Sequence, residues 1–127
     1  MTKPRPPLVE HCLELFAPLG AVRSKSMFGG WGFYLDDHFF ALIADDTLFL
    51  KTDQQTESAF KEVGSFPFTY TYKDGRRVTM AYWSAPEDAM ESPPMMYDWA
   101  RLALGAALRA RKPAKLRSAG KTKSSRA

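Results

Sequence analysis

Two acidic pairs divide the middle of the chain into short apolar runs of similar length. Asp36-Asp37 separates residues 31–35 from 38–43, and Asp45-Asp46 separates 38–43 from 47–51. Asp tolerates the backbone conformations of tight turns and bonds to its own backbone, so an acidic pair between such runs predicts a hairpin. Because hairpins join antiparallel neighbours, residues 22–53 are predicted to form an antiparallel meander of about three or four strands.

A helical pattern precedes this meander. Apolar residues recur there at the spacing of one helix face, and they are Leu8, Val9, Cys12, Leu15, Phe16 and Leu19. Glu10, His11 and Glu14 occupy the opposite face, and Pro18 and Gly20 are expected to end the helix. Cys12 falls on the apolar stripe, where a thiol usually fills space and is not reactive.

A second helix is predicted after the meander. Asp53 is expected to cap a helix over 54–63, with Phe60 and Val63 turned inward and Gly64 at its end.

A hairpin follows, and its register can be predicted from the turn. A three-residue loop, Lys73-Asp74-Gly75, with Gly75 in the left-handed conformation, places Phe68 opposite Met80 and Tyr70 opposite Val78. That register gathers the apolar side chains on one face, namely Phe68, Tyr70, Val78, Met80 and Tyr82. A two-residue loop would pair Tyr70 with Thr79 and mix polar and apolar side chains on both faces. The three-residue loop is therefore preferred.

A last helix is predicted after a short helical turn at 86–90. It starts at Ser92-Pro93 and ends at about Arg111. Its apolar arc covers roughly 240°, much wider than the stripe of a surface helix, and small residues line the middle of the arc: Ala100, Ala103, Ala106 and Ala107. The helix is either wedged between elements of its own fold or packed against a second chain as a homodimer, and the first is favoured.

Charge is distributed unevenly along the chain. All 14 acidic residues lie in 1–108 with 10 of the 18 Lys and Arg residues, so this part carries −4. The remaining cations lie in a segment without acids and are the candidate nucleic-acid contacts: Arg109, Arg111, Lys112, Lys115, Arg117, Lys121, Lys123 and Arg126. Spread cations neutralise phosphates without reading bases. A merely solubilising terminus explains the same pattern.

The composition divides the chain into three parts. A flexible leader is predicted over 1–7, a folded domain over 8–111 and a basic disordered tail over 112–127. No signal peptide or membrane span is recognisable. The single cysteine excludes an internal disulfide and favours a cytoplasmic location.

No catalytic, cofactor or metal site is predicted. The glycines of 27–34 precede a strand and lack a following Gly-Lys-Ser/Thr, so they do not form a phosphate loop. They predict a bend at which another backbone or ring packs closely. Cys12, His11 and His38 would have to converge with a carboxylate to hold a metal, and no nucleophile, base and orienting group occur together. The chain is accordingly predicted not to be an enzyme.

Several segments together resemble one known family, the N-terminal domain of the TfoX/Sxy regulators of bacterial competence genes. They are Val-Arg-Ser-Lys-Ser-Met-Phe-Gly-Gly-Trp-Gly-Phe-Tyr at 22–34, residues 40–45, 48–51 and 66–70, and Trp-Ala-Arg-Leu-Ala-Leu at 99–104. The resemblance covers about 8–111. Its motif residues are assigned a structural role: Met27, Phe28, Gly29, Gly30, Gly32 and Trp99.

The resemblance implies a two-layer α+β domain, similar to secretion-chaperone-like folds. Its antiparallel sheet would have about five to six strands with helices packed on it, in the order helix, three or four strands, helix, two strands, helix. It also implies a transcriptional co-regulator that acts with a DNA-binding activator of the cyclic-AMP receptor type. The competence regulators carry a second, helical domain, whereas a basic tail follows here.

The sequence thus predicts a non-enzymatic interaction domain that regulates transcription through a protein partner, with weak non-specific DNA contact through the tail and no membrane contact. The alternative is a small-ligand-binding or enzymatic domain with a pocket near the bend at 27–34. A homodimer stays open.

Overall fold

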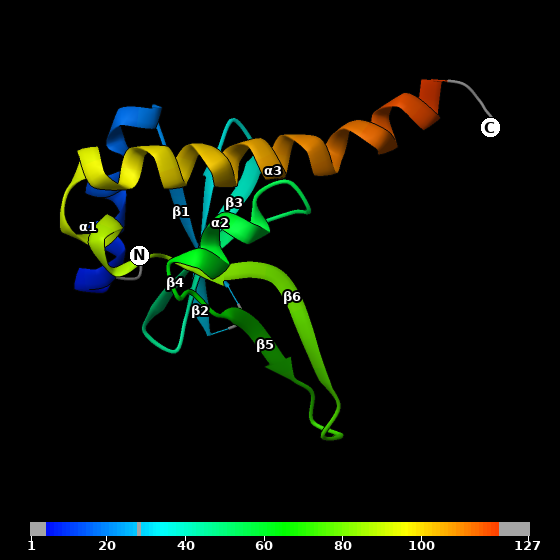
Figure 1. The fold of residues 1–127 in the computed structure, drawn as a ribbon, viewed down its shortest axis with the longest axis horizontal. Helices are drawn as coiled ribbons and strands as arrows, with labels where there is room; N and C mark the ends of the chain where they lie inside the picture. The colour runs from blue at the N-terminus through cyan, green and yellow to red at the C-terminus, as the bar shows by residue number, and fades with distance from the viewer. Residues whose placement is uncertain (1–4, 28, 120–127) are drawn as a thin grey trace.

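The computed structural model describes residues 5–27 and 29–119, with side chains through residue 110. It is an α+β fold in which helices pack on a six-stranded antiparallel sheet (Figure 1). In chain order the elements are α1 (Pro7–Phe16), η1 (Ala17–Leu19), β1 (Arg23–Met27), β2 (Gly30–Leu35), β3 (His38–Ala44), β4 (Thr47–Lys51), α2 (Glu57–Glu62), β5 (Pro67–Thr71), β6 (Arg77–Ser84), η2 (Glu87–Glu91) and α3 (Pro93–Ala119). The predicted fold class and element order are confirmed.

The first four strands form the predicted meander. The strand order is β1-β2-β3-β4-β6-β5, so β6 joins the meander at β4 and leaves β5 on the edge. Both acidic pairs form the tight turns expected of them, with φ values of 50° and 67° at Asp36 and Asp37 and of 52° and 58° at Asp45 and Asp46. Two consecutive left-handed residues match the twist of the flanking strands, which is why Asp is accepted there.

The core lies between the sheet and the helices α1 and α3. The apolar stripe of α1 is buried, and the ring of Phe16 packs edge-on against Phe33 and Phe40 with centroids 5.3 and 5.0 Å apart. Burying a Phe side chain of this kind contributes about 2–3 kcal/mol. The alanines of α3 are buried at 100, 103, 106 and 107, so this helix approaches its neighbours closely. The middle of its wide apolar arc is therefore packed within the fold, whereas Met95, Tyr97 and Leu108 on the same helix are exposed, so a homodimer through this helix stays a prediction.

Two helix boundaries differ from the prediction. Helix α2 begins at Glu57, because residues 53–56 form turns in which Thr56 and Glu57 donate backbone N–H groups to the Asp53 carbonyl. Val63 was expected inward, but it follows the helix and is 52% exposed, so that prediction is wrong. Gly64 has φ 83° and ends the helix as expected.

Helix α3 is longer than predicted. Its helical backbone continues past Arg111 to Ala119, and its C-terminal part extends beyond the sheet (Figure 1). Good helix formers such as Ala, Lys, Leu and Arg follow Pro113, so the helix propensity of these residues favours continuation of the helix. Residues 120–127 and 1–4 lie outside the described residues, and the division into leader, domain and tail stays a prediction.

The β5–β6 hairpin has the predicted turn. Tyr70 pairs with Val78, Gly75 has φ +90°, and the Tyr72 N–H donates to the Arg76 carbonyl at 2.8 Å. The expected pairing of Phe68 with Met80 is not formed, because the register shifts between Pro67 and Thr69. The hairpin projects away from α3 (Figure 1), so most of its side chains are solvent-exposed.

Candidate functional site

The sheet carries a groove, and none of the described residues that line it belongs to a helix. Its volume is about 650 Å³, and every described lining residue belongs to a strand or to a connection between strands. Most of the lining side chains are aromatic or aliphatic: Met27, Trp31, Phe39, Leu42, Ile43, Ala44, Phe68, Tyr70, Tyr72, Met80 and Tyr82. Gly29, Gly30, Asp45, Thr69 and Thr71 complete it. The β5–β6 hairpin thus borders an open apolar groove together with β1, β2, β3 and their turns.

Three aromatic rings pack in a row at the floor of this groove, and two of them, Phe39 and Tyr82, line it. Tyr34 stacks on Phe39 with centroids 5.0 Å apart, and Phe39 lies 5.7 Å from Tyr82. Burial and the neighbouring Tyr34 raise the pKa of Tyr82 to about 12. Lys51 Nζ lies 4.9 Å from the centroid of the Tyr82 ring, and burial lowers the pKa of Lys51 while the nearby Asp53 carboxylate opposes that shift.

Glycines allow the groove end to pack tightly. A Cβ at Gly30 would collide with the carbonyl oxygen of Ile43, and one at Gly32 would lie 2.6 Å from Phe39 Cε1 and 2.8 Å from Met27 Cε. The predicted close approach at the glycine-rich bend is confirmed. Of the other resemblance residues, Trp99 packs edge-on against Phe60 with centroids 4.9 Å apart. Phe28 lies outside the described residues.

The groove lies where the sequence placed its alternative pocket, near the bend at 27–34. The face predicted for the hairpin supplies Phe68, Tyr70, Met80 and Tyr82 to it. Sequence reasoning missed Phe39 as a lining residue, and for Asp45 it preferred a role in the turn over binding of a cation. The apolar run at 38–43 could have indicated Phe39. However, a bulge in the β2–β3 pairing determines which side chains of β2 share a face of the sheet with Phe39, and the sequence does not show that bulge.

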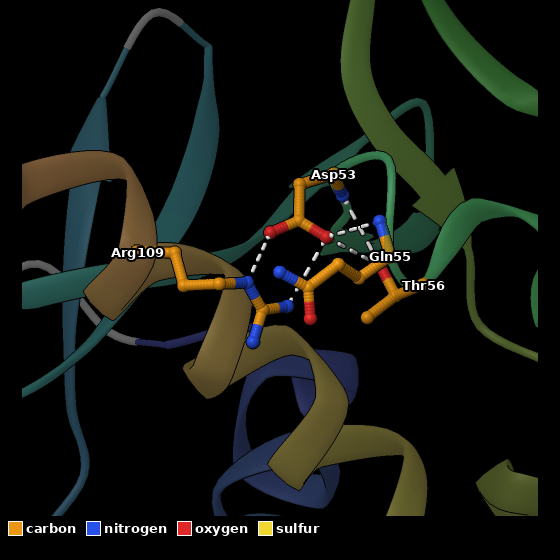
Figure 2. A network of polar contacts seen from close by, with 4 residues as sticks. All are labelled: Asp53, Gln55, Thr56 and Arg109. Atoms are coloured by element: carbon orange, nitrogen blue, oxygen red, sulfur yellow. Dashed lines mark hydrogen bonds and ion pairs between the residues drawn. The ribbon is translucent and has the colours of Figure 1, made fainter.

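An ion pair links α3 to the segment after β4 (Figure 2). Arg109 Nε donates to Asp53 Oδ2 at 2.6 Å and Arg109 Nη2 to Asp53 Oδ1 at 3.1 Å. The Gln55 N–H also donates to Asp53 Oδ1 at 3.0 Å, and the Asp53 N–H donates to Thr56 Oγ1 at 3.1 Å. The hydrogen bond from Arg109 is the largest cause that lowers the pKa of Asp53, and the same bond raises the pKa of Arg109.

This network has a structural role. It joins residues 56 apart in the sequence, and the two side chains are only 37% and 28% exposed. Two parallel N–H···O bonds fix the guanidinium in one orientation. Arg109, predicted as a nucleic-acid contact, is therefore held by a carboxylate of its own chain.

The structure does not describe the other predicted tail contacts. The side chains of Arg111, Lys112, Lys115 and Arg117 are outside the described part, and so are residues Lys121, Lys123 and Arg126 altogether. Their contact with nucleic acid stays a prediction.

The candidate metal ligands have separate structural roles. His11 Nε2 forms a hydrogen bond of 2.7 Å with the carbonyl of Met90, and His38 opens strand β3. Cys12 is fully buried, and burial raises the pKa of its thiol to about 12. In residues 5–27 and 29–110, no three His, Cys, Asp or Glu side chains gather as a metal site. Among the described helices, none is both long and apolar enough to cross a membrane.

Together the fold and the groove define an α+β domain whose helices pack on an antiparallel sheet that presents an apolar groove. The chain matches the TfoX N-terminal domain over residues 14–107 and belongs to that family. It is 33% identical over 97 residues to Protein Sxy of Escherichia coli (strain K12), covering 76% of this chain and 46% of Sxy. It is 30% identical over 66 residues to DNA transformation protein TfoX1 of Aliivibrio fischeri (strain ATCC 700601 / ES114), covering 52% of this chain and 32% of TfoX1. The matches thus span less than half the length of these relatives.

Proposed function

We propose that the chain is a non-enzymatic interaction domain that regulates transcription through a protein partner in the cytoplasm. The observation that carries this proposal is the family match over residues 14–107. The resemblance to competence-gene regulators implies a partner that is itself a DNA-binding transcription activator. The groove supports the proposal because an exposed apolar surface of this kind is typical of interaction sites.

The proposal assigns different tasks to the two charged parts of the chain. The body over 1–108 carries −4 and would contact the protein partner. The cations after Arg109 would hold DNA phosphates without sequence preference. Arg109 itself is paired with Asp53, so the phosphate contacts begin at Arg111.

A deletion strain tests this function. The gene would be removed from its native host and restored as the wild type or as a version with Lys115, Arg117, Lys121 and Lys123 changed to Gln. RNA sequencing is expected to show a defined set of transcripts that changes on deletion and is restored by the wild type, with partial restoration by the neutralised tail. Identical transcript profiles in the deletion and parent strains would contradict the proposal.

A small-ligand function is the second candidate, because the groove volume of about 650 Å³ lies in the range of ligand pockets. A thermal-shift screen of the purified chain against a metabolite panel separates the two. A ligand that raises Tm in proportion to its concentration, and fails to do so in a groove variant, would favour this second function.

A further inference from the structure

The groove offers an apolar surface that the described chain leaves accessible. Tyr70 is 47% and Met80 is 39% exposed, although both are large and apolar. Both lie on the hairpin that projects from the sheet. A two-stranded ribbon gains little stability by itself, so apolar side chains along it are best explained by a binding role.

The charge at the groove selects the kind of occupant. Asp45 is the one charged side chain among the described lining residues, and two cations lie against lining rings, Lys51 on Tyr82 at 4.9 Å and Arg76 on Tyr72 at 4.5 Å from the ring centroids. In the part of the chain with described side chains, the Asp45 carboxylate forms no ion pair, whereas Asp53 and Asp74 are paired with arginines. The surrounding body, residues 1–108, carries −4. A cationic occupant is therefore attracted at the Asp45 end of the groove and by the net charge of this body, whereas the rings of Tyr72 and Tyr82 already carry cations of the chain itself.

The side chains of the groove fit a peptide with apolar and cationic residues. Aromatic faces accept Lys and Arg as well as aliphatic groups, and Trp31 and Tyr70 supply such faces. Met27 and Met80 are flexible and polarizable, which suits them to packing against irregular side chains. Phosphates of a nucleic acid would instead meet Asp45 and the negative body at a cost.

We infer that this groove binds a basic, apolar-rich peptide segment of the protein partner. Apolar side chains of the segment lie on the aromatic floor, and a Lys or Arg pairs with Asp45. The inference rests on the proposed function in that it names the surface and chemistry by which the partner is bound.

Binding of a defined probe to the full chain tests the inference. The probe is a fluorescein-labelled peptide, Lys-Leu-Lys-Phe-Lys-Leu-Lys, read by fluorescence anisotropy at low salt. A peptide with Glu in place of every Lys and an oligothymidine of ten nucleotides serve as the alternative probes. Each groove variant has a matched control. The control for Met80→Gln is Met95→Gln, because the Met95 side chain is 49% exposed on α3. The control for Asp45→Asn is Asp46→Asn, which changes the other residue of the same turn.

The basic peptide is expected to bind, with affinity lowered roughly fivefold by Met80→Gln and about threefold by Asp45→Asn. The control variants should bind as the wild type does. Circular dichroism melts identify any variant that fails to fold, and Tyr70→Ser then replaces it. Equal binding by all variants, or preference for the Glu peptide, would overturn the inference.

Two further outcomes would also overturn it. Oligothymidine binding that is lost with Tyr70→Ser would make the groove a nucleic-acid site. A dimer in analytical ultracentrifugation that Met80→Gln dissociates would make the occupant a second copy. These results are independent of the transcript profiles, since a chain without regulatory effect can still bind the peptide and a regulator can still leave the groove empty.

Discussion

The thiol of Cys12 illustrates how burial determines reactivity at the scale of one residue. Because burial raises its pKa to about 12, the reactive thiolate is scarce at pH 8. The native protein is expected to react with a thiol reagent such as dithionitrobenzoate only through unfolding, and thus far more slowly than in 6 M guanidinium chloride. Fast stoichiometric reaction of the native protein would contradict the buried position.

Two glycines are expected to respond to the same substitution with opposite signs. Gly30→Ala introduces a methyl group against the Ile43 carbonyl, a backbone atom of the adjacent strand, so it should lower the free energy of unfolding by about 2 kcal/mol. Gly105→Ala lies in α3, where the nearest atom is the tip of Arg109 at 3.4 Å. It should raise stability by roughly 0.5 to 1 kcal/mol through helix propensity.

Urea denaturation of both variants measures this difference, with Gly105→Ala as the control for the method. A neutral Gly30→Ala would show that β2 and β3 can separate locally, and would remove the packing explanation for the glycine.

At the scale of elements, the Asp53–Arg109 pair fastens α3 to the segment between β4 and α2. The folded-state pKa of Asp53 is lowered, so the pair stabilises the fold at pH values above the unfolded pKa of about 4. That contribution is lost as the pH falls through the lowered value. Asp53→Asn keeps the hydrogen-bond acceptor for the Gln55 N–H but removes the charge that pairs with Arg109. It should lower the free energy of unfolding at pH 7 by only about 1 kcal/mol, because both side chains of the pair are partly exposed.

The measurement is urea denaturation at pH 7 and near pH 2.5. The difference between wild type and Asp53→Asn should shrink as the pH is lowered, because an increasing fraction of the wild-type carboxylate is then protonated. Asp74→Asn is the matched control, since Asp74 pairs with Arg76 inside one hairpin turn. A difference that is the same at both pH values would assign the effect to something other than the ion pair.

Local signals made most elements predictable and left the long-range contacts unpredicted. The turns at Asp36-Asp37 and Asp45-Asp46 and the loop at Gly75 depend on a few adjacent residues, so the sequence located them and the hairpin register with them. The register shift at Phe68 depends on how β6 bends to reach β4, which no local pattern encodes.

The candidate site was predicted only in outline for the same reason. The alternation on 68–72 placed Phe68 and Tyr70 on one apolar face, and the glycines indicated a close approach nearby. Asp53 and Arg109 are 56 residues apart, and each had a sufficient local explanation, as a helix cap and as a tail cation. Their pairing follows from where α3 crosses the sheet, which only the three-dimensional structure defines.

At the scale of the whole molecule, the negative body and the positive tail make opposite contributions to DNA binding. Changing Lys115, Arg117, Lys121 and Lys123 to Gln removes half of the eight cations in 109–127 and leaves the Asp53–Arg109 pair intact. DNA affinity at low salt should fall by at least about tenfold, and the slope of log K against log salt should become less negative by about 0.9 for each lost phosphate contact. Fluorescence anisotropy with a random-sequence duplex measures both quantities. A control with Lys73 and Arg77 changed to Gln removes two cations from the hairpin instead and should leave the slope unchanged. The contrary result is a slope that becomes less negative in the hairpin control and stays unchanged in the tail variant. In that case the hairpin makes the phosphate contacts, and the assignment of DNA binding to the tail is wrong.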